Sequence, residues 1–231
     1  MKRSIVQAIN PRIVNPYAGV VKEKNGRTKH YITATYSGYT EGVETKIFNT
    51  GGLSDDLFTV FIKPDGGKPT KVNPTYLNGA AMLDLSGTST TLIIYIPTGQ
   101  MPTGMFLAVQ DLTQVSLTGI ETISDKAFKS APLSSHDMSF SGVSVVGNEA
   151  FSGCLAPANL SFDGSLTSIG DKAFDFVDDG NMIFKFQSTT PPTLGTTPFP
   201  SEMDYIINVP AALIPIYKQE WSQYASYITA T

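Results

Sequence analysis

The chain has 231 residues, a formal net charge of −4 and a charged fraction of only 16%, which fits one large or two modest globular domains. It contains no basic run, and a nucleic-acid-binding surface needs clustered Lys and Arg to displace phosphate counterions, so we expect no nucleic-acid partner. It also contains no apolar run long enough to cross a bilayer, so we expect no membrane insertion.

The N-terminus begins with basic residues but lacks the apolar stretch of a secretory signal peptide. Two localisations are therefore open. If a signal has been removed, the protein is extracellular or attached to a cell surface. If Met1 is the native start, a place in a virion becomes the better expectation.

Residues 1–111 show a strand-like pattern, with no competing helical period. Turn signals such as Asn25-Gly26 and Gly51-Gly52 separate six segments rich in β-branched and aromatic residues. The expected strands are 31–36, 43–48, 57–62, 80–85, 91–96 and 105–109. This density of short strands predicts an antiparallel β-sandwich. We expect 96–104 to be a loop, so that a second domain, 112–231, follows without a flexible linker.

The second half contains an internal repeat. Three segments, which begin at Ile120, Val143 and Leu166, align without gaps, and their Phe residues are 23 positions apart. Each has a second aliphatic residue three positions on, then a small residue, Asp or Asn, a charged residue and Ala-Phe. A degenerate fourth copy carries Leu194 and Phe199. We expect the aliphatic residues and the Ala-Phe pair to face the core.

Each repeat also predicts a helix start and a strand. Asp125, Asn148 and Asp171 stand where a helix N-cap is expected, so a short helical segment is predicted there. About ten residues after each Phe comes an apolar alternation of period two, which predicts a short strand. The alternating pairs are Met138/Phe140, Leu160/Phe162, Phe184/Phe186 and Ile207/Val209. Stacked repeats of this kind form a parallel sheet over a continuous Phe core.

This pattern, with Gly or Ser, Asp or Asn, and Lys or Glu before Ala-Phe, resembles the BspA-like leucine-rich repeat of bacterial surface proteins. Residues 190–194, 207–210 and 217–225 resemble the C-terminal cap common in such proteins from Bacteroidetes-type bacteria. Leu213, Tyr217, Trp221 and Tyr224 fall at helix spacing, so we expect a capping helix over the last repeat. The resemblance covers about residues 113–231 and implies a leucine-rich-repeat solenoid that is displayed on a surface and binds protein or glycan.

No catalytic or metal-binding pattern stands out. His30 and His136 lie in different halves, and neither has a second His or Cys at ligand spacing, whereas a metal site needs three or four converging ligands. Cys154, the single cysteine, is better explained as a small buried hydrophobe than as a nucleophile. We therefore predict no enzyme activity, no cofactor and no metal site.

The candidate binding surface is the outward side of the repeat strands. Ser139, Ser161, Lys185 and Asn208 lie between inward-facing residues, and Ser141, Asp163 and Gln187 flank them. Aligned across a sheet, they form the face that solenoids use for binding. Ordinary solvated strand surface is the alternative interpretation.

Three hypotheses for function follow. The first is a surface attachment protein that binds protein or glycan, or copies of itself, through the solenoid. The second is a phage structural or decoration protein that is anchored by its N-terminal β-domain, with residues such as Ile5, Val6 and Ile9 at the contact. The third is an accessory part of a glycan-active enzyme, which needs paired carboxylates in a cleft.

Overall fold

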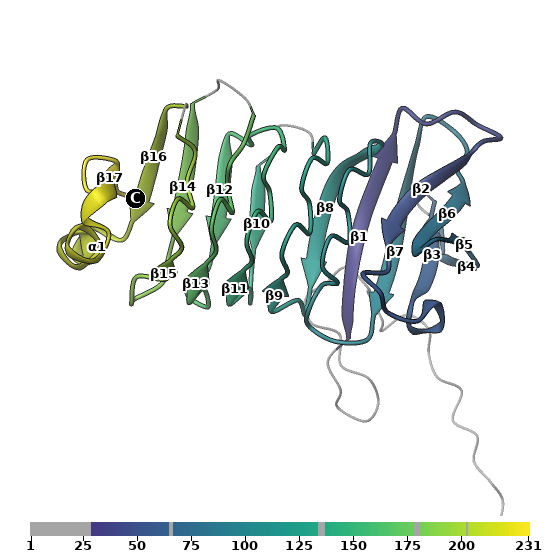
Figure 1. Cartoon of the computed structure of the whole chain (residues 1–231), viewed down its shortest axis with the longest axis horizontal. Helices are drawn as coiled ribbons and strands as arrows, with labels where there is room; N and C mark the ends of the chain where they lie inside the picture. The colour runs from purple at the N-terminus through teal and green to yellow at the C-terminus, as the bar shows by residue number, and fades with distance from the viewer. Residues whose placement is uncertain (1–28, 65–66, 134–136, 178–180, 202) are drawn as a thin grey trace, which may run out of the picture.

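A computed structural model of the chain describes residues 29–64, 67–133, 137–177, 181–201 and 203–231. The described part is mostly β, with one short α-helix, α1 (Ile214–Glu220), near the C-terminus. Figure 1 shows an elongated molecule in which antiparallel sheets form one end, a stack of parallel strands forms the middle, and α1 lies at the other end.

Two antiparallel sheets form the N-terminal end. The larger has the order β4 (Thr70–Val72), β3 (Thr59–Lys63), β7 (Ser89–Ile96), β1 (His30–Ser37) and β8 (Leu112–Thr118). The smaller has the order β2 (Glu44–Asn49), β6 (Ala80–Asp84) and β5 (Thr75–Leu77). Five of the six predicted strands are thereby confirmed to within two residues. The sandwich arrangement stays a prediction.

The predicted loop over 96–104 is confirmed, apart from Ile96, which ends β7, and an isolated bridge at Gln100, but the sixth predicted strand, 105–109, is wrong. These residues form a turn that belongs to an additional repeat. The N–H of Met101 donates to the Thr122 carbonyl at 3.0 Å, and the N–H of Phe106 donates to the Ala127 carbonyl at 2.6 Å. The apolar residues of this segment therefore face inward from a turn. Their sequence pattern alone does not distinguish such a turn from a β-strand.

The repeats build two parallel sheets. The short-strand sheet has the order β15 (Thr193–Leu194), β13 (Ser168–Ile169), β11 (Val145–Val146) and β9 (Thr122–Ile123). The long-strand sheet has the order β10 (Met138–Phe140), β12 (Asn159–Phe162), β14 (Met182–Phe186), β16 (Tyr205–Val209) and β17 (Ile228–Ala230). The four strands predicted from apolar alternation are confirmed as β10, β12, β14 and β16.

The predicted helical segments after Asp125, Asn148 and Asp171 are wrong, because the next residue of each repeat has a left-handed backbone that an α-helix does not accommodate. Their φ angles are 58° at Lys126, 53° at Glu149 and 51° at Lys172. The Asp and Asn side chains instead link successive repeats. Asp125 Oδ1 accepts the Asn148 N–H at 2.7 Å, and Asn148 Oδ1 accepts the Asp171 N–H at 2.8 Å.

The residue before the N–H donor of each link is a glycine, for a steric reason. A Cβ atom on Gly147 would lie 2.5 Å from both the backbone nitrogen and the Oδ1 atom of Asp125 in the preceding repeat. Gly170 stands in the same relation to Asn148. The close approach of successive turns therefore requires glycine at this position.

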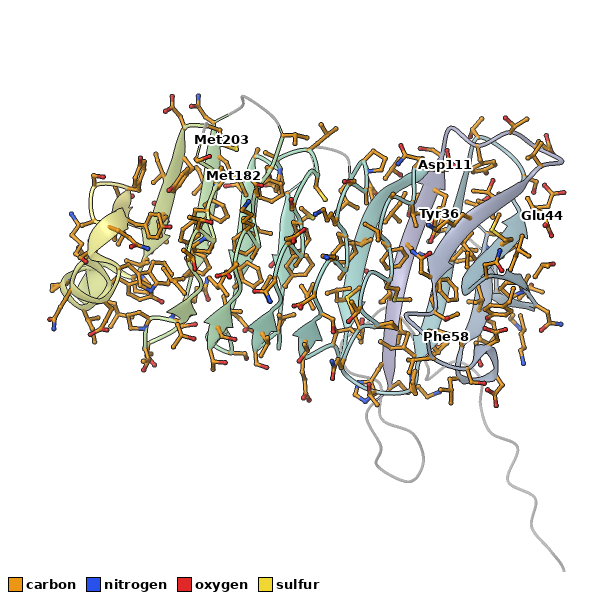
Figure 2. The ribbon with its side chains drawn as sticks, viewed as in Figure 1. Tyr36, Glu44, Phe58, Asp111, Met182 and Met203 are labelled. Carbon is orange, nitrogen blue, oxygen red and sulfur yellow. The ribbon has the colours of Figure 1, made fainter. Side chains whose placement is uncertain are left out.

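A column of phenylalanine rings fills the centre of the stack. Consecutive ring centroids are 5.4 Å apart from Phe106 to Phe128, 5.0 Å to Phe151, 5.9 Å to Phe174 and 6.0 Å to Phe199, and all four pairs are stacked. Figure 2 shows ring side chains along the inside of the strands. One hydrophobic core runs from the N-terminal sheets, with Ile32 and Phe48, to Ile228 in β17.

The C-terminal segment packs on the end of this column. Tyr217 and Trp221 are buried, while Leu213 and Tyr224 are half-buried against the core. The predicted capping helix is present as α1, but it is short. Two short 3-10 helices, Ala211–Leu213 and Ser222–Tyr224, flank α1, and the segment ends in β17, which the sequence did not predict. The chain thus ends the long-strand sheet with a strand and covers the Phe column with a helix.

Candidate functional site

The predicted outward residues form one row across the long-strand sheet. Ser139 pairs with Ser161, Ser161 with Lys185, and Lys185 with Asn208 in the parallel register. Asn208 pairs in turn with Thr229 of β17. Because the neighbouring residues of each strand are buried, these side chains lie on the outer face of the sheet. We call this set the outer row.

The regular register of the outer row follows from the repeat. The first inward-facing residue of each strand is apolar, such as Met138 in β10 and Leu160 in β12, and these two residues lie opposite one another. At the C-terminal end, the Thr229 hydroxyl donates to Asn208 Oδ1 at 2.7 Å. The outer row therefore follows the register of the sheet, and a hydrogen bond joins its last two members.

Asp163, predicted to flank this row, is occupied by contacts within the stack. Its Oδ2 atom accepts the Ser141 hydroxyl and the Gly142 N–H, each at 2.8 Å, and its Oδ1 atom accepts the Ser165 N–H at 2.9 Å. Burial alone would raise the pKa of Asp163, but the hydrogen bonds from Ser165, Ser141 and Gly142 lower it below the usual range. Asp163 thus links two repeats as a carboxylate, whereas Gln187 beside it is exposed.

A second row of the same face was not predicted. Asn159 pairs with Ile183, and Ile183 pairs with Ile206, two positions before the outer row in each strand. Asn159 Nδ2 donates to Asp137 Oδ1 at 2.9 Å. Ile206 is 44% exposed, which is unusual for a residue in the middle of a strand. The two-residue alternation that predicted the outer row also points to this one.

Together the two rows form a face with an apolar patch at its C-terminal repeats. Ile183 and Ile206 lie beside Lys185 and Asn208, and the hydroxyl and amide side chains of Ser161 and Asn159 continue the face toward the earlier repeats. Met182 and Met203, labelled in Figure 2, mark the end of the long strands nearest to the second row. The face offers hydrogen-bonding groups, one cation and a small apolar patch.

Within the described ranges, no group of three or more His, Cys, Asp and Glu side chains is placed to hold a metal ion. His30 Nδ1 lies 2.5 Å from the Gly119 carbonyl oxygen, and His136 is outside the described residues. No helix in the described part of the chain has the length and apolar character to cross a bilayer.

Cys154 has the surroundings of a structural residue. Its thiol is buried and donates to the Phe128 carbonyl at 2.8 Å. Burial raises the pKa of the Cys154 thiol to about 12. Because the thiolate is the reactive form, this group is a poor nucleophile near neutral pH.

Comparison with known families identifies the central part of the chain. Residues 89–190 match the family model described as the BspA type leucine rich repeat region (6 copies). The match begins in β7, includes the additional repeat around Phe106, and ends before β15, so the first N-terminal strands and the C-terminal cap lie outside it. No curated protein matches the chain.

Proposed function

From a BspA-type leucine-rich repeat region over residues 89–190, we propose that the protein is a non-enzymatic recognition module, displayed on a cell surface, that binds a protein partner through the outer face of its long-strand sheet. The observation that carries the proposal is the outer row, in which Ser139, Ser161, Lys185, Asn208 and Thr229 stand in register on five consecutive strands.

The composition of the face favours a protein partner over a glycan. Ile183 and Ile206 give it an apolar patch, and the polar side chains of Ser161, Lys185 and Asn208 border one side of that patch. Protein–protein interfaces likewise combine apolar contacts with polar groups at their rim. The family supports the same class of function, because leucine-rich repeats generally mediate protein interactions and BspA-like proteins are usually found at surfaces.

The stiffness of the support favours binding. The strands that carry the face pack on the Phe column through Phe162 and Phe184, whose rings lie 5.9 and 5.2 Å from that of Phe174, and the Asp125 and Asn148 side chains link the turns of successive repeats. A face that is ordered before binding loses little conformational entropy when a partner docks. The N-terminal sheets would then serve as the anchor. The residues proposed for that contact, Ile5, Val6 and Ile9, lie outside the described residues. No observation on the described residues favours a virion location or an enzyme accessory.

The proposal is tested with beads that carry the full chain and are applied to host-cell surfaces. Ile206→Asp places a charge in the apolar patch, and Ser161→Arg places a long side chain on the outer row, so each should abolish adhesion without affecting the buried core. Lys172→Glu is the matched control, because Lys172 is exposed on a turn away from the face. It should adhere as the unchanged chain does.

Treatment of the cell surface identifies the class of partner. Protease treatment should remove adhesion, and glycosidase treatment should leave it. Loss of adhesion after glycosidase alone would replace the protein partner with a glycan. Normal adhesion of both face variants would place the binding site elsewhere.

A further inference from the structure

A hollow of about 520 Å³ lies where the short-strand sheet meets the C-terminal cap. One wall is formed by residues 191–196, which include β15, and the other by residues 220–223 of the cap. We call this hollow the edge pocket. It is separate from the outer face of the long-strand sheet, because β15 belongs to the other sheet of the stack.

The edge pocket exists because the two sheets end differently. The long-strand sheet continues from β16 to β17, but β15 is the last strand of the short-strand sheet. On the inner side of β15, the N–H groups of Thr193 and Gly195 donate to the carbonyls of Thr167 and Ile169 at 2.9 and 2.8 Å. Since successive peptide groups of a strand point to opposite sides, the N–H and C=O of Leu194 point outward, toward the open edge.

In each earlier repeat, the corresponding carbonyl group accepts a backbone hydrogen bond from the next repeat. The Ile123 carbonyl accepts the Gly147 N–H at 2.7 Å, and the carbonyls of Val146 and Ile169 accept the N–H groups of Gly170 and Gly195, each at 2.8 Å. Leu194 is the next member of this series, and within the described residues no backbone N–H donates to its carbonyl. The edge pocket is thus the place that another repeat would occupy.

The cap occupies only part of this edge. The indole N–H of Trp221 donates to the Pro192 carbonyl at 2.9 Å, which satisfies the carbonyl group just before β15. The Trp221 ring is 3% exposed and packs against Phe186 and Tyr217, so it offers no open ring face on which a sugar could stack. Glu220 is the one ionisable residue among those that line the pocket, and it is exposed.

We propose that the edge pocket binds an extended peptide with a basic side chain, which pairs its backbone with the N–H and C=O of Leu194 and places its cation beside Glu220. Strand addition of this kind takes its affinity from main-chain hydrogen bonds and its selectivity from alternate side chains. Binding here is independent of adhesion through the outer face, so each site can be tested while the other is intact.

The test uses the full chain, labelled with ¹⁵N, and the peptide acetyl-Thr-Val-Lys-Val-Thr-amide. We expect saturable shifts of the amide resonances of Leu194, Thr196, Ser222 and Gln223. A peptide with Glu in place of Lys should bind more weakly. Glu220→Gln should weaken binding of the lysine peptide about two- to fivefold, the range for an exposed ion pair. Glu121→Gln, which alters an exposed carboxylate at the opposite edge of the same sheet, should leave it unchanged.

N-methylated peptides test the backbone pairing. One carries methyl groups on both valine amides and the other on the lysine amide, and these amides face opposite sides of an extended chain. One of the two should lose binding and the other should keep it. The proposal is overturned if millimolar peptide produces no saturable shift at residues 193–196, if both methylated peptides bind alike, or if the lysine and glutamate peptides bind equally.

Discussion

Replacement of Phe151 by Ala should be among the most destabilising single changes in the repeat stack. Its side chain is 0% exposed and stacks between Phe128 at 5.0 Å and Phe174 at 5.9 Å. It also contacts the rings of Phe140 at 5.8 Å and Phe176 at 6.3 Å. The change therefore removes a ring that has partners on every side and leaves a cavity that the rigid neighbouring repeats cannot close.

Truncation of such a residue costs about 3–5 kcal/mol, and the four aromatic contacts place Phe151→Ala toward the upper end. For a chain of this size, that loss corresponds to a decrease in Tm of about 6–20 °C. The matched control is Val177→Ala, a truncation in the next repeat at a residue that is 65% exposed. It should change the free energy of unfolding by less than about 0.5 kcal/mol.

The measurement is urea unfolding followed by both far-UV circular dichroism and the fluorescence of Trp221, the single tryptophan. Trp221 reports on the cap, and circular dichroism reports on all the sheets, so coincident curves establish a cooperative transition. A surface substitution changes the free energy of unfolding by up to about 0.5 kcal/mol. If Phe151→Ala changes it by no more than that, the central column does not stabilise the stack and the reasoning fails.

Three further predictions concern single features of the stack. Gly147→Ala should destabilise by about 1–3 kcal/mol because of its overlap with Asp125, while Gly164→Ala, whose nearest new contact is at 3.6 Å, should be neutral in the same urea assay. Cys154 should react with a thiol reagent only on unfolding, and rapid labelling of native protein at neutral pH would contradict its burial. The pKa of the Cys154 thiol is about 12 in the folded chain, which exceeds its value in the unfolded chain. The contribution of this thiol to the free energy of unfolding is therefore complete below the unfolded pKa and declines as the pH rises toward 12. Cys154→Ala should reduce that decline. Truncation after Val209 should expose the Phe column and cause aggregation, and a monomeric truncated protein with unchanged melting would show that the cap is dispensable.

The sequence predicted the long strands and the outer row because both depend on simple periodicities. Met138 and Phe140 alternate with Ser139, so the direction of each side chain follows from the pleat. The same alternation recurs 22 residues later, one residue short of the 23-residue spacing of the Phe residues, and Ser139 lies opposite Ser161. Neither inference depends on a contact that is distant in sequence.

The turns were mispredicted because two structures share one local pattern. An Asp before Lys-Ala-Phe suits a helix N-cap, but it equally suits a side chain that accepts the N–H of the next repeat, and only the stack decides between them. The repeat before Ile120 was missed because it has Thr103-Gly104-Met105-Phe106 in place of the Asp-Lys-Ala-Phe pattern. Its signals were the position of Phe106, 22 residues before Phe128, and a glycine where the φ angle is 63°.

The last prediction concerns the division of the chain at residue 111, which we propose separates the parts in function rather than in folding. Strand β8 follows this boundary, yet it pairs with β1 from Tyr31 opposite Thr118 to Tyr36 opposite Leu112. Phe106 precedes the boundary, yet its ring stacks on Phe128 at 5.4 Å and an interplanar angle of 6°. A cut at residue 111 therefore removes an edge strand from one fragment and the first ring of the Phe column from the other.

Each fragment would then expose apolar surface that the intact chain buries, because one hydrophobic core spans the boundary. We expect residues 1–111 and 112–231, expressed separately, to be insoluble or to lack a cooperative thermal transition. Co-expression should restore a soluble complex of the two, because the β1–β8 pairing and the Phe106–Phe128 contact can re-form between chains. Size-exclusion chromatography and thermal melts decide the matter. Two fragments that are each monomeric and melt cooperatively would show that the boundary separates independent folding units, and that the shared core contributes little to the stability of either.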